Sequence, residues 1–227
     1  MAATHSKLWY LEQVDLLKGL GDEAIQRVAD HTVAATAQKD QHIWFPEQPS
    51  NVIFFLKRGR VKIASMGEDG KEVIKAVLYP GEVFGELSLA GEDKRRDHAV
   101  ALDNDVDICA MNIEDVQEMM RENPAVNLAM TRLIGERVIS IERRLEGLIF
   151  KDSRTRIVDL LKEMAVKYGQ QVGHETLLKH ALTHQDFADL TATSRQTVTT
   201  VLNDLKKNDL VYMERGKLLI RDLKRLK

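Results

Sequence analysis

Polar side chains suited to reading DNA bases follow one another near residue 195. Arg195 and Gln196 stand side by side, and Thr199 and Thr200 come one helical turn later. An arginine fork matches guanine O6 and N7, and a glutamine amide matches adenine N6 and N7. Ser194 precedes them, and serine is a preferred residue at the start of a helix. The spacing therefore predicts a helix that presents these side chains from its first turns.

The surrounding segment, residues 184–203, has the pattern of a helix-turn-helix. Phe187 and Leu190 give a first helix its apolar face, and Ala188 is small where two helices would cross. The buried face of the second helix is predicted to consist of Val198, Val201, Leu202 and Leu205. Such a second helix enters the major groove. A two-helix hairpin with a polar face and no nucleic-acid partner is the alternative.

The eight predicted DNA contacts divide by chemistry. Those expected to hold phosphates and fix the register are His184, Gln185, Ser194 and Thr197. Those expected to face the bases are Arg195, Gln196, Thr199 and Thr200. A strand pair around Arg215-Gly216, formed by residues 210–213 and 217–220, makes this a winged helix-turn-helix.

The net charge of −2 conceals two halves of opposite sign. Residues 151–227 carry +5, and residues 1–150 carry −7, so the positive half coincides with the predicted DNA-binding segment. A single cysteine, Cys109, excludes an intramolecular disulfide framework. The longest apolar run, residues 52–56, is too short to span a bilayer. We expect a cytoplasmic protein with no membrane partner.

The spacing of apolar residues along the rest of the chain changes twice, from helical to strand-like and back to helical. Residues 8–35 have helical spacing, with Leu8, Leu11, Val14, Leu17 and Leu20 at every third position. From Gln38 to about Ala110, short apolar clusters separated by turn residues predict a β-sandwich or small barrel, with a hairpin at Asp69-Gly70. The predicted strands are residues 43–45, 52–56, 61–63, 73–78, 83–84, 100–102 and 106–110. Helices are predicted over residues 112–122, 124–150 and 154–168, and a loop over 169–179.

The helix over residues 124–150 carries an apolar seam. Its members alternate spacings of four and three residues, as in a heptad repeat: Ile134, Val138, Ile141, Leu145 and Leu148. Charged residues flank the seam, which favours a paired helix in water and hence a homodimer. A helix packed on its own domain is the alternative.

Taken together, these parts resemble the Crp/Fnr family of bacterial transcription regulators. The resemblance rests on residues 11–20, on Leu56-Lys-Arg-Gly-Arg-Val-Lys-Ile63, on Pro80-Gly-Glu-Val-Phe-Gly-Glu-Leu87 and on Ser194-Arg-Gln-Thr-Val198. It implies an α+β fold with an N-terminal double-stranded β-helix or jelly-roll domain of the cyclic-nucleotide-binding type (residues 1–123). A dimerisation helix (124–150) and a C-terminal winged helix-turn-helix (151–227) follow. It also implies a homodimeric regulator, not an enzyme, that binds a near-palindromic DNA site and works with RNA polymerase.

The resemblance also assigns an effector pocket. Gly85, Glu86 and Leu87 match the family's motif, in which the Glu accepts a hydrogen bond from a ribose hydroxyl, and Arg96 stands where an Arg neutralises the cyclic phosphate. Asp97 replaces a Ser or Thr, and Ile141-Glu142 replaces a Thr-Ser pair against adenine. A carboxylate near a phosphate is repelled by it, so Asp97 is expected to pair with Arg95 or Arg96 and close the pocket.

These departures predict that the effector is not cyclic AMP. Another small molecule, a dinucleotide or no effector at all remain open, and so does cyclic AMP binding despite the altered pocket. The sequence assigns no metal or resident cofactor. A redox sensor needs more cysteines than Cys109, and a metalloenzyme on a similar roll needs more ligands than His42 and His98. A nucleotide-binding module that regulates a partner protein would lack the winged helix.

Overall fold

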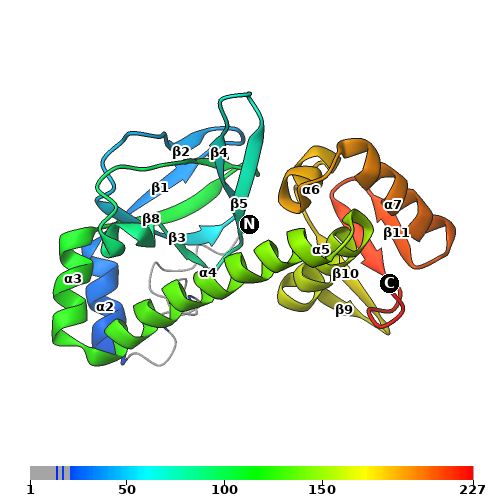
Figure 1. Cartoon of the computed structure of the whole chain (residues 1–227). Coiled ribbons are helices and arrows are strands. Elements are labelled where there is room, and N and C mark those ends of the chain that lie inside the picture. The colour runs from blue at the N-terminus through cyan, green and yellow to red at the C-terminus, as the bar shows by residue number, and fades with distance from the viewer. Residues whose placement is uncertain (1–13, 15–16, 18–20, 227) are drawn as a thin grey trace. The chain divides into compact units, whose positions relative to one another are not determined.

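The computed structural model describes residues 14, 17 and 21–226, and the chain divides into two compact units (Figure 1). The first unit comprises residues 1–71 and 75–139, and the second comprises residues 72–74 and 140–227. The boundary falls inside the long helix α4 (Pro124–Phe150). Each unit therefore includes one part of this helix.

Two four-stranded sheets form the roll of the first unit. One has the order β1-β8-β3-β6 and the other the order β2-β7-β4-β5. The strands of the first are β1 (Thr32–Ala37), β8 (Val106–Asn112), β3 (Val52–Arg58) and β6 (Val83–Phe84). Those of the second are β2 (His42–Trp44), β7 (His98–Ala101), β4 (Val61–Met66) and β5 (Glu72–Leu78). Antiparallel pairing places Phe55 of β3 opposite Cys109 of β8. The predicted jelly-roll fold is confirmed.

The β4–β5 hairpin turns at the predicted Asp69-Gly70 pair. Gly67 N–H donates to the Lys71 carbonyl over 2.8 Å, and Gly70 has a positive φ of 77°. Glycine reaches that backbone conformation without steric cost. Inside the roll, a core packs side chains from both sheets, among them Trp44, Leu56, Leu78, Phe84 and Ala99.

Among the described residues, the short helices that accompany the roll are α2 (Asp22–His31), the 3-10 helix η2 (Glu86–Ala90) and α3 (Ile113–Glu122). A second core joins α2, α3 and the first turns of α4 to one sheet and includes Val14, Leu17, Val28, Val116 and Met130. The predicted helical spacing over residues 8–35 is wrong at its end, because residues 32–37 form strand β1. Leu8, Leu11 and Leu20 lie outside the described residues.

The second unit continues from α4 with helices and a four-stranded sheet in the order β11-β12-β10-β9. Its elements are α5 (Ser153–Tyr168), β9 (Gln170–Val172), β10 (Glu175–Lys179), α6 (His184–Thr191), α7 (Arg195–Lys207), β11 (Val211–Glu214) and β12 (Lys217–Ile220). The loop predicted over residues 169–179 is wrong, because β9 and β10 pair antiparallel there. Gly173, at φ 61°, makes the turn between them.

The core beneath the helix-turn-helix has the predicted members. Phe187 and Ala188 of α6 are fully buried, as are Val198, Leu202 and Leu205 of α7. Ala188, where the sequence predicted a small residue, has no exposed surface. Within the part of the chain that the structure describes, no helix is both long and apolar enough to cross a membrane.

Candidate nucleic-acid interface and effector pocket

The recognition helix α7 begins with a side-chain cap. Ser194 Oγ accepts from Thr197 N–H at 3.0 Å and lies 2.8 Å from Thr197 Oγ1. This bond satisfies one of the amides that a helix start leaves without a partner. The two hydroxyls predicted to hold phosphates are thus used first to hold each other, and they fix where α7 begins.

Helix α6 begins with a complete capping box that the sequence analysis did not identify. Thr183 Oγ1 accepts from Asp186 N–H at 3.1 Å, and the Asp186 carboxylate accepts from Thr183 N–H at 2.7 Å. The signal was present as a Thr followed three residues later by an acidic residue. The box fixes the direction in which α6 begins, and so the position of the His184 and Gln185 side chains that follow it.

The side chains of Arg195 and Gln196 have no hydrogen-bond or ion-pair partner among the described residues. Both are exposed. They occupy the first two positions of α7, where backbone amides point outward and the helix dipole is positive. The fork and the amide are therefore free to pair with base edges.

The two threonines of the same face use their hydroxyl groups in hydrogen bonds within α7. Thr199 Oγ1 donates to the Arg195 carbonyl at 2.9 Å, and Thr200 Oγ1 donates to the Gln196 carbonyl at 3.0 Å. His184 Nδ1 lies 2.9 Å from Thr199 Oγ1. Since the Thr199 hydroxyl donates to the helix, it accepts from His184, and this bond ties α6 to α7.

A hollow opens where α6 and α7 begin. Its lining is Thr183, His184, Gln185 and Arg195. Two helix N-termini and one guanidinium face it, which is the chemistry of a phosphate site. Gln185 also donates to Asp189 over 2.8 Å, so its amide is held in place along α6.

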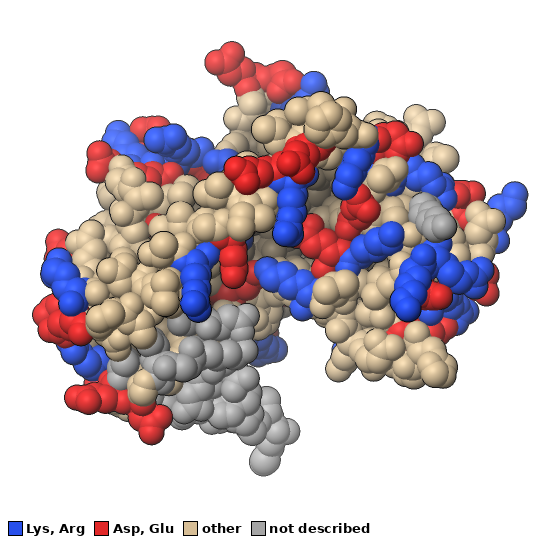
Figure 2. All heavy atoms as spheres, turned by 60° about the horizontal axis from the view of Figure 1, so that its bottom comes forward, with Lys and Arg blue, Asp and Glu red and all other residues tan. Residues whose placement is uncertain are grey.

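Figure 2 shows basic and acidic side chains interspersed on one face of the molecule. The candidate DNA interface rests on the residues of α6 and α7 and on the +5 charge of residues 151–227.

The predicted effector pocket begins at a glycine in the left-handed backbone conformation. Gly85 has φ 84°, and a Cβ there would lie 2.8 Å from the Val52 carbonyl oxygen and 3.1 Å from Arg95 Nη2. Only glycine fits both the conformation and the space. The turn directs Glu86 into the protein, where Arg137 of α4 reaches it with Nε 3.3 Å from Oε1. Arg137 also donates to the Val83 carbonyl over 3.3 Å.

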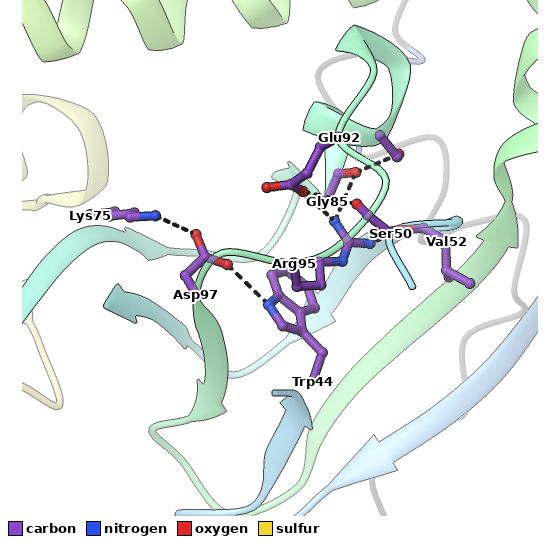
Figure 3. Close-up of polar contacts among 9 residues, drawn as sticks. Trp44, Ser50, Val52, Lys75, Gly85, Glu92, Arg95 and Asp97 are labelled. Atoms are coloured by element: carbon purple, nitrogen blue, oxygen red, sulfur yellow. Dashed lines mark hydrogen bonds and ion pairs between the residues drawn. The ribbon is translucent and has the colours of Figure 1, made fainter. Parts of the chain in front are cut away.

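Arg95, rather than the expected Arg96, is the arginine inside the roll (Figure 3). The Arg95 side chain is 3% exposed, whereas Arg96 is exposed. Arg95 donates to the carbonyls of Val52 and Gly85 and lies 3.6 Å from Glu92 Oε2. Arg95 and Asp97 are both buried and Arg96 between them is exposed, so the bend at residues 96 and 97 turns only Arg95 of the two arginines into the roll.

Asp97 does not form the expected pair with either arginine. Its Oδ1 accepts from Trp44 Nε1 at 3.1 Å, and its Oδ2 accepts from Lys75 Nζ at 2.9 Å. The Arg95 guanidinium lies over the Trp44 ring, 4.5 Å from its centroid, so the indole stands between the two charges. Figure 3 shows the arginine on the ring and the carboxylate at the indole N–H.

Burial has an electrostatic consequence for Arg95. It lowers the pKa of the guanidinium, and the carboxylates of Glu92, Asp97 and Glu86 oppose that shift. An arginine stays charged in any case, so the roll holds a buried cation together with its counter-charges. The remaining predicted pocket residues, Leu87, Ile141 and Glu142, have exposed side chains.

The predicted dimer seam is exposed along most of its length. The exposed fractions are 49% for Val138, 65% for Ile141, 58% for Leu145 and 50% for Leu148, and Ile134 is partly buried. Large apolar side chains repeated along one helix at this exposure are typical of a surface that binds another protein.

Comparisons with known proteins agree on both halves of the chain. A family model of the cyclic nucleotide-binding domain matches residues 35–123, and one of the Crp-like helix-turn-helix domain matches residues 155–227. A global nitrogen regulator from Nostoc is 30% identical over 190 residues, which cover 83% of this chain and 85% of the relative. The chain belongs to the Crp/Fnr family of transcriptional regulators.

Other Crp/Fnr proteins are similar over comparable lengths. A CRP-like cAMP-activated global transcriptional regulator from Mycobacterium tuberculosis is 27% identical over 209 residues, 88% of this chain and 93% of the relative. A CooA mutant from Carboxydothermus hydrogenoformans has a TM-score of 0.72 at 28% identity and covers 87% of each chain. FixK2 from Bradyrhizobium japonicum, at 19% identity, shares the fold, with a TM-score of 0.77 over 86% of this chain and 95% of FixK2. The protein is thus a DNA-binding Crp/Fnr regulator.

Proposed function

We propose that this Crp/Fnr regulator acts as a homodimer on a near-palindromic DNA site and that cyclic AMP is not its effector. The exposed apolar seam of α4, on the same chain as a capped recognition helix, carries the proposal. The proposed parts are a sensory roll over residues 1–123, a dimerisation helix over 124–150 and a DNA-binding domain over 151–227.

A second copy of this chain is the partner that fits the seam. The four exposed members follow the 3.5-residue repeat that keeps a seam facing an identical helix, and an isolated copy would leave them in water. A symmetric pair presents two copies of α7. Two such helices enter successive major grooves about 34 Å apart, so the DNA site mirrors the protein's two-fold symmetry.

The proposed contacts with DNA fall into two groups: side chains without hydrogen bonds inside the protein read bases, and most of those that form such bonds bind phosphates. Arg195 and Gln196 read bases, with the methyl and hydroxyl groups of Thr199 and Thr200 next along α7. His184 and Gln185 bind phosphates at the hollow where α6 and α7 begin. Ser194 and Thr197 bind phosphates with the hydroxyl groups that cap α7. RNA polymerase is the proposed protein partner, because the family regulates transcription.

The roll supports an effector other than cyclic AMP, or none. Glu86 is paired with Arg137, and Arg95 is held by two carbonyls and Glu92. A cyclic phosphate would have to displace these partners and approach Asp97, a carboxylate of the same sign.

A cyclic-nucleotide-responsive regulator is the second candidate. The match of residues 35–123 to the cyclic nucleotide-binding domain favours it. The names of the relatives do not choose between effectors, since one is a cAMP-activated regulator and another a global nitrogen regulator.

The dimer is tested by a charge placed in the seam. Leu145→Glu introduces two carboxylates where the helices would meet, and we expect monomers in analytical ultracentrifugation and loss of binding to a site selected from random DNA by the wild type. Glu146→Gln, at the neighbouring exposed position, is the control and should remain dimeric. A monomeric wild type, or a dimeric Leu145→Glu variant, contradicts the proposal.

The effector is tested by thermal shift and DNA binding with cyclic AMP, cyclic GMP, cyclic di-GMP and no ligand. We expect specific binding without added nucleotide and no stabilisation by cyclic AMP. Stabilisation by cyclic AMP together with tighter DNA binding would establish the second candidate.

A further inference from the structure

One guanidinium in the second unit contacts both the turn of the helix-turn-helix and the connection between α4 and α5. Arg156, on the first turn of α5, donates from Nε to the Thr191 carbonyl at 2.8 Å and from Nη2 to the Ala192 carbonyl at 3.2 Å. The same side chain donates from Nη1 to the Lys151 carbonyl at 2.7 Å and from Nη2 to Ser153 Oγ at 3.3 Å. Four contacts leave little freedom for the planar fork.

Two of these carbonyls belong to the turn of the helix-turn-helix. Thr191 ends α6, and Ala192 has the left-handed backbone conformation, with φ 48° and ψ 55°. A residue with a Cβ adopts this conformation only at some cost in energy. Arg156 holds the carbonyls on both sides of that turn, and the turn sets the angle between α6 and the recognition helix α7.

The other contacts belong to the connection between α4 and α5. Lys151 follows the last residue of α4, and its N–H donates to the Gly147 carbonyl at 3.1 Å. Gly147 is buried, and a Cβ there would lie 4.0 Å from Arg156 Cδ, so the arginine stem runs beside the last turn of α4. The ends of α4 and α6 are both negative poles of helix dipoles, and one cation lies at both.

We propose that Arg156 is a positioning residue that sets the direction of the recognition helix relative to the dimer helix. In a pair of chains, this direction fixes the distance between the two copies of α7 and hence the spacing of the half-sites. The inference rests on the homodimer of the proposed function. Lysine cannot replace arginine here, because one ammonium lacks the fork that reaches separate carbonyls.

The neighbouring Arg154 supplies a matched control. It lies on the same turn of α5 and pairs through Nη1 with Asp204 Oδ2 of α7 at 2.7 Å. Among the described residues, it forms no hydrogen bond or ion pair with α4 or with the turn of the helix-turn-helix. Arg154→Lys and Arg156→Lys make the same chemical change and preserve the net charge and every trypsin site, so a difference between them reports on the contacts of Arg156.

The first measurement requires neither a dimer nor DNA. Trypsin cleaves after Lys151, and this bond becomes accessible when the connection opens. For the full-length Arg156→Lys variant we expect cleavage there to be about tenfold faster than for the wild type and for Arg154→Lys. Cleavage at the wild-type rate overturns the proposal, because the connection would then be held without the fork.

The second measurement tests whether Arg156 sets the spacing of the half-sites, which a residue that only stabilises the fold would not change. A site selected by the wild type is shortened or lengthened at its centre by one or two base pairs, and the affinities of the three proteins are compared. Wild type and Arg154→Lys should lose affinity steeply with each change, whereas Arg156→Lys should bind the original site about tenfold more weakly and lose much less on the altered sites. An unchanged spacing preference in Arg156→Lys overturns the proposal. Selected sites without paired half-sites would instead refute the homodimer, and the cleavage rates would then decide the role of Arg156.

Discussion

The recognition surface and the roll pocket differ in what their charged side chains already hold. On α7, Arg195 and Gln196 are exposed and bind nothing within the described chain. In the roll, Glu86, Arg95 and Asp97 are buried and each has a partner of its own. The first surface is complete only with a ligand, whereas the second is satisfied without one. Substitutions should therefore reduce binding in the first region and stability in the second.

The largest effect on stability is expected at Arg95. Arg95→Met removes a buried cation and leaves the buried Glu92 carboxylate with its hydrogen bond from Ser50 but without a counter-charge. This loss should lower the free energy of unfolding by about 3–5 kcal/mol. Tryptophan fluorescence during urea unfolding measures this, because both tryptophans, Trp9 and Trp44, precede α4. Arg96→Met is the matched control and should change stability by less than about 0.5 kcal/mol. Equal losses in the two variants would contradict the assignment of Arg95 to the interior.

The converse behaviour is expected at Arg195. Arg195→Ala should weaken binding to the selected site by ~1–3 kcal/mol per half-site and relax base preference at one position, since the fork to guanine is lost. Its unfolding free energy should stay within about 0.5 kcal/mol of the wild type, because the side chain is exposed.

Fluorescence anisotropy with the selected and a scrambled DNA measures the change at Arg195, and Arg96→Ala controls for the loss of one positive charge. If Arg195→Ala binds both DNAs as the wild type does, Arg195 does not contact a base and the proposed role of α7 is wrong.

A smaller effect is expected where Glu86 meets Arg137. A double-mutant cycle with Glu86→Gln and Arg137→Gln should give a coupling energy of about 1–2 kcal/mol, because the carboxylate is buried while Arg137 is 28% exposed. Urea unfolding of the four proteins gives the cycle. Additive effects would show that the pair does not stabilise the roll.

The helix-turn-helix could be predicted from sequence because its determinants are local. The Ser194 cap, the small Ala188 and the apolar spacing of Val198, Val201 and Leu202 all lie within one segment. The long helix was also predicted with its observed bounds, since Pro124 starts it and the apolar seam continues to its end.

The errors have physical reasons. Strand β1 follows helix α2 without a break, and its burial pattern leaves the four central residues exposed, so no inward-facing apolar alternation marks it. The three residues of β9 are all exposed and are defined only by pairing with β10. Arg96 was predicted to face the pocket because it lies ten residues after Glu86, but Arg95 enters the roll instead. The chain between Glu86 and these arginines includes the 3-10 helix η2, so sequence distance alone does not fix which arginine faces inward.

The Glu86–Arg137 pair has a thermodynamic consequence for any molecule that would use this pocket. A ligand that needs the Glu86 carboxylate must compete with Arg137, and its apparent affinity is the intrinsic affinity multiplied by the fraction of copies in which the pair is open. Arg137 thus acts as a competitor tethered to the protein, present at the same effective concentration whatever the conditions outside. A substitution at residue 137 should therefore change the apparent affinity of any ligand that uses the Glu86 carboxylate.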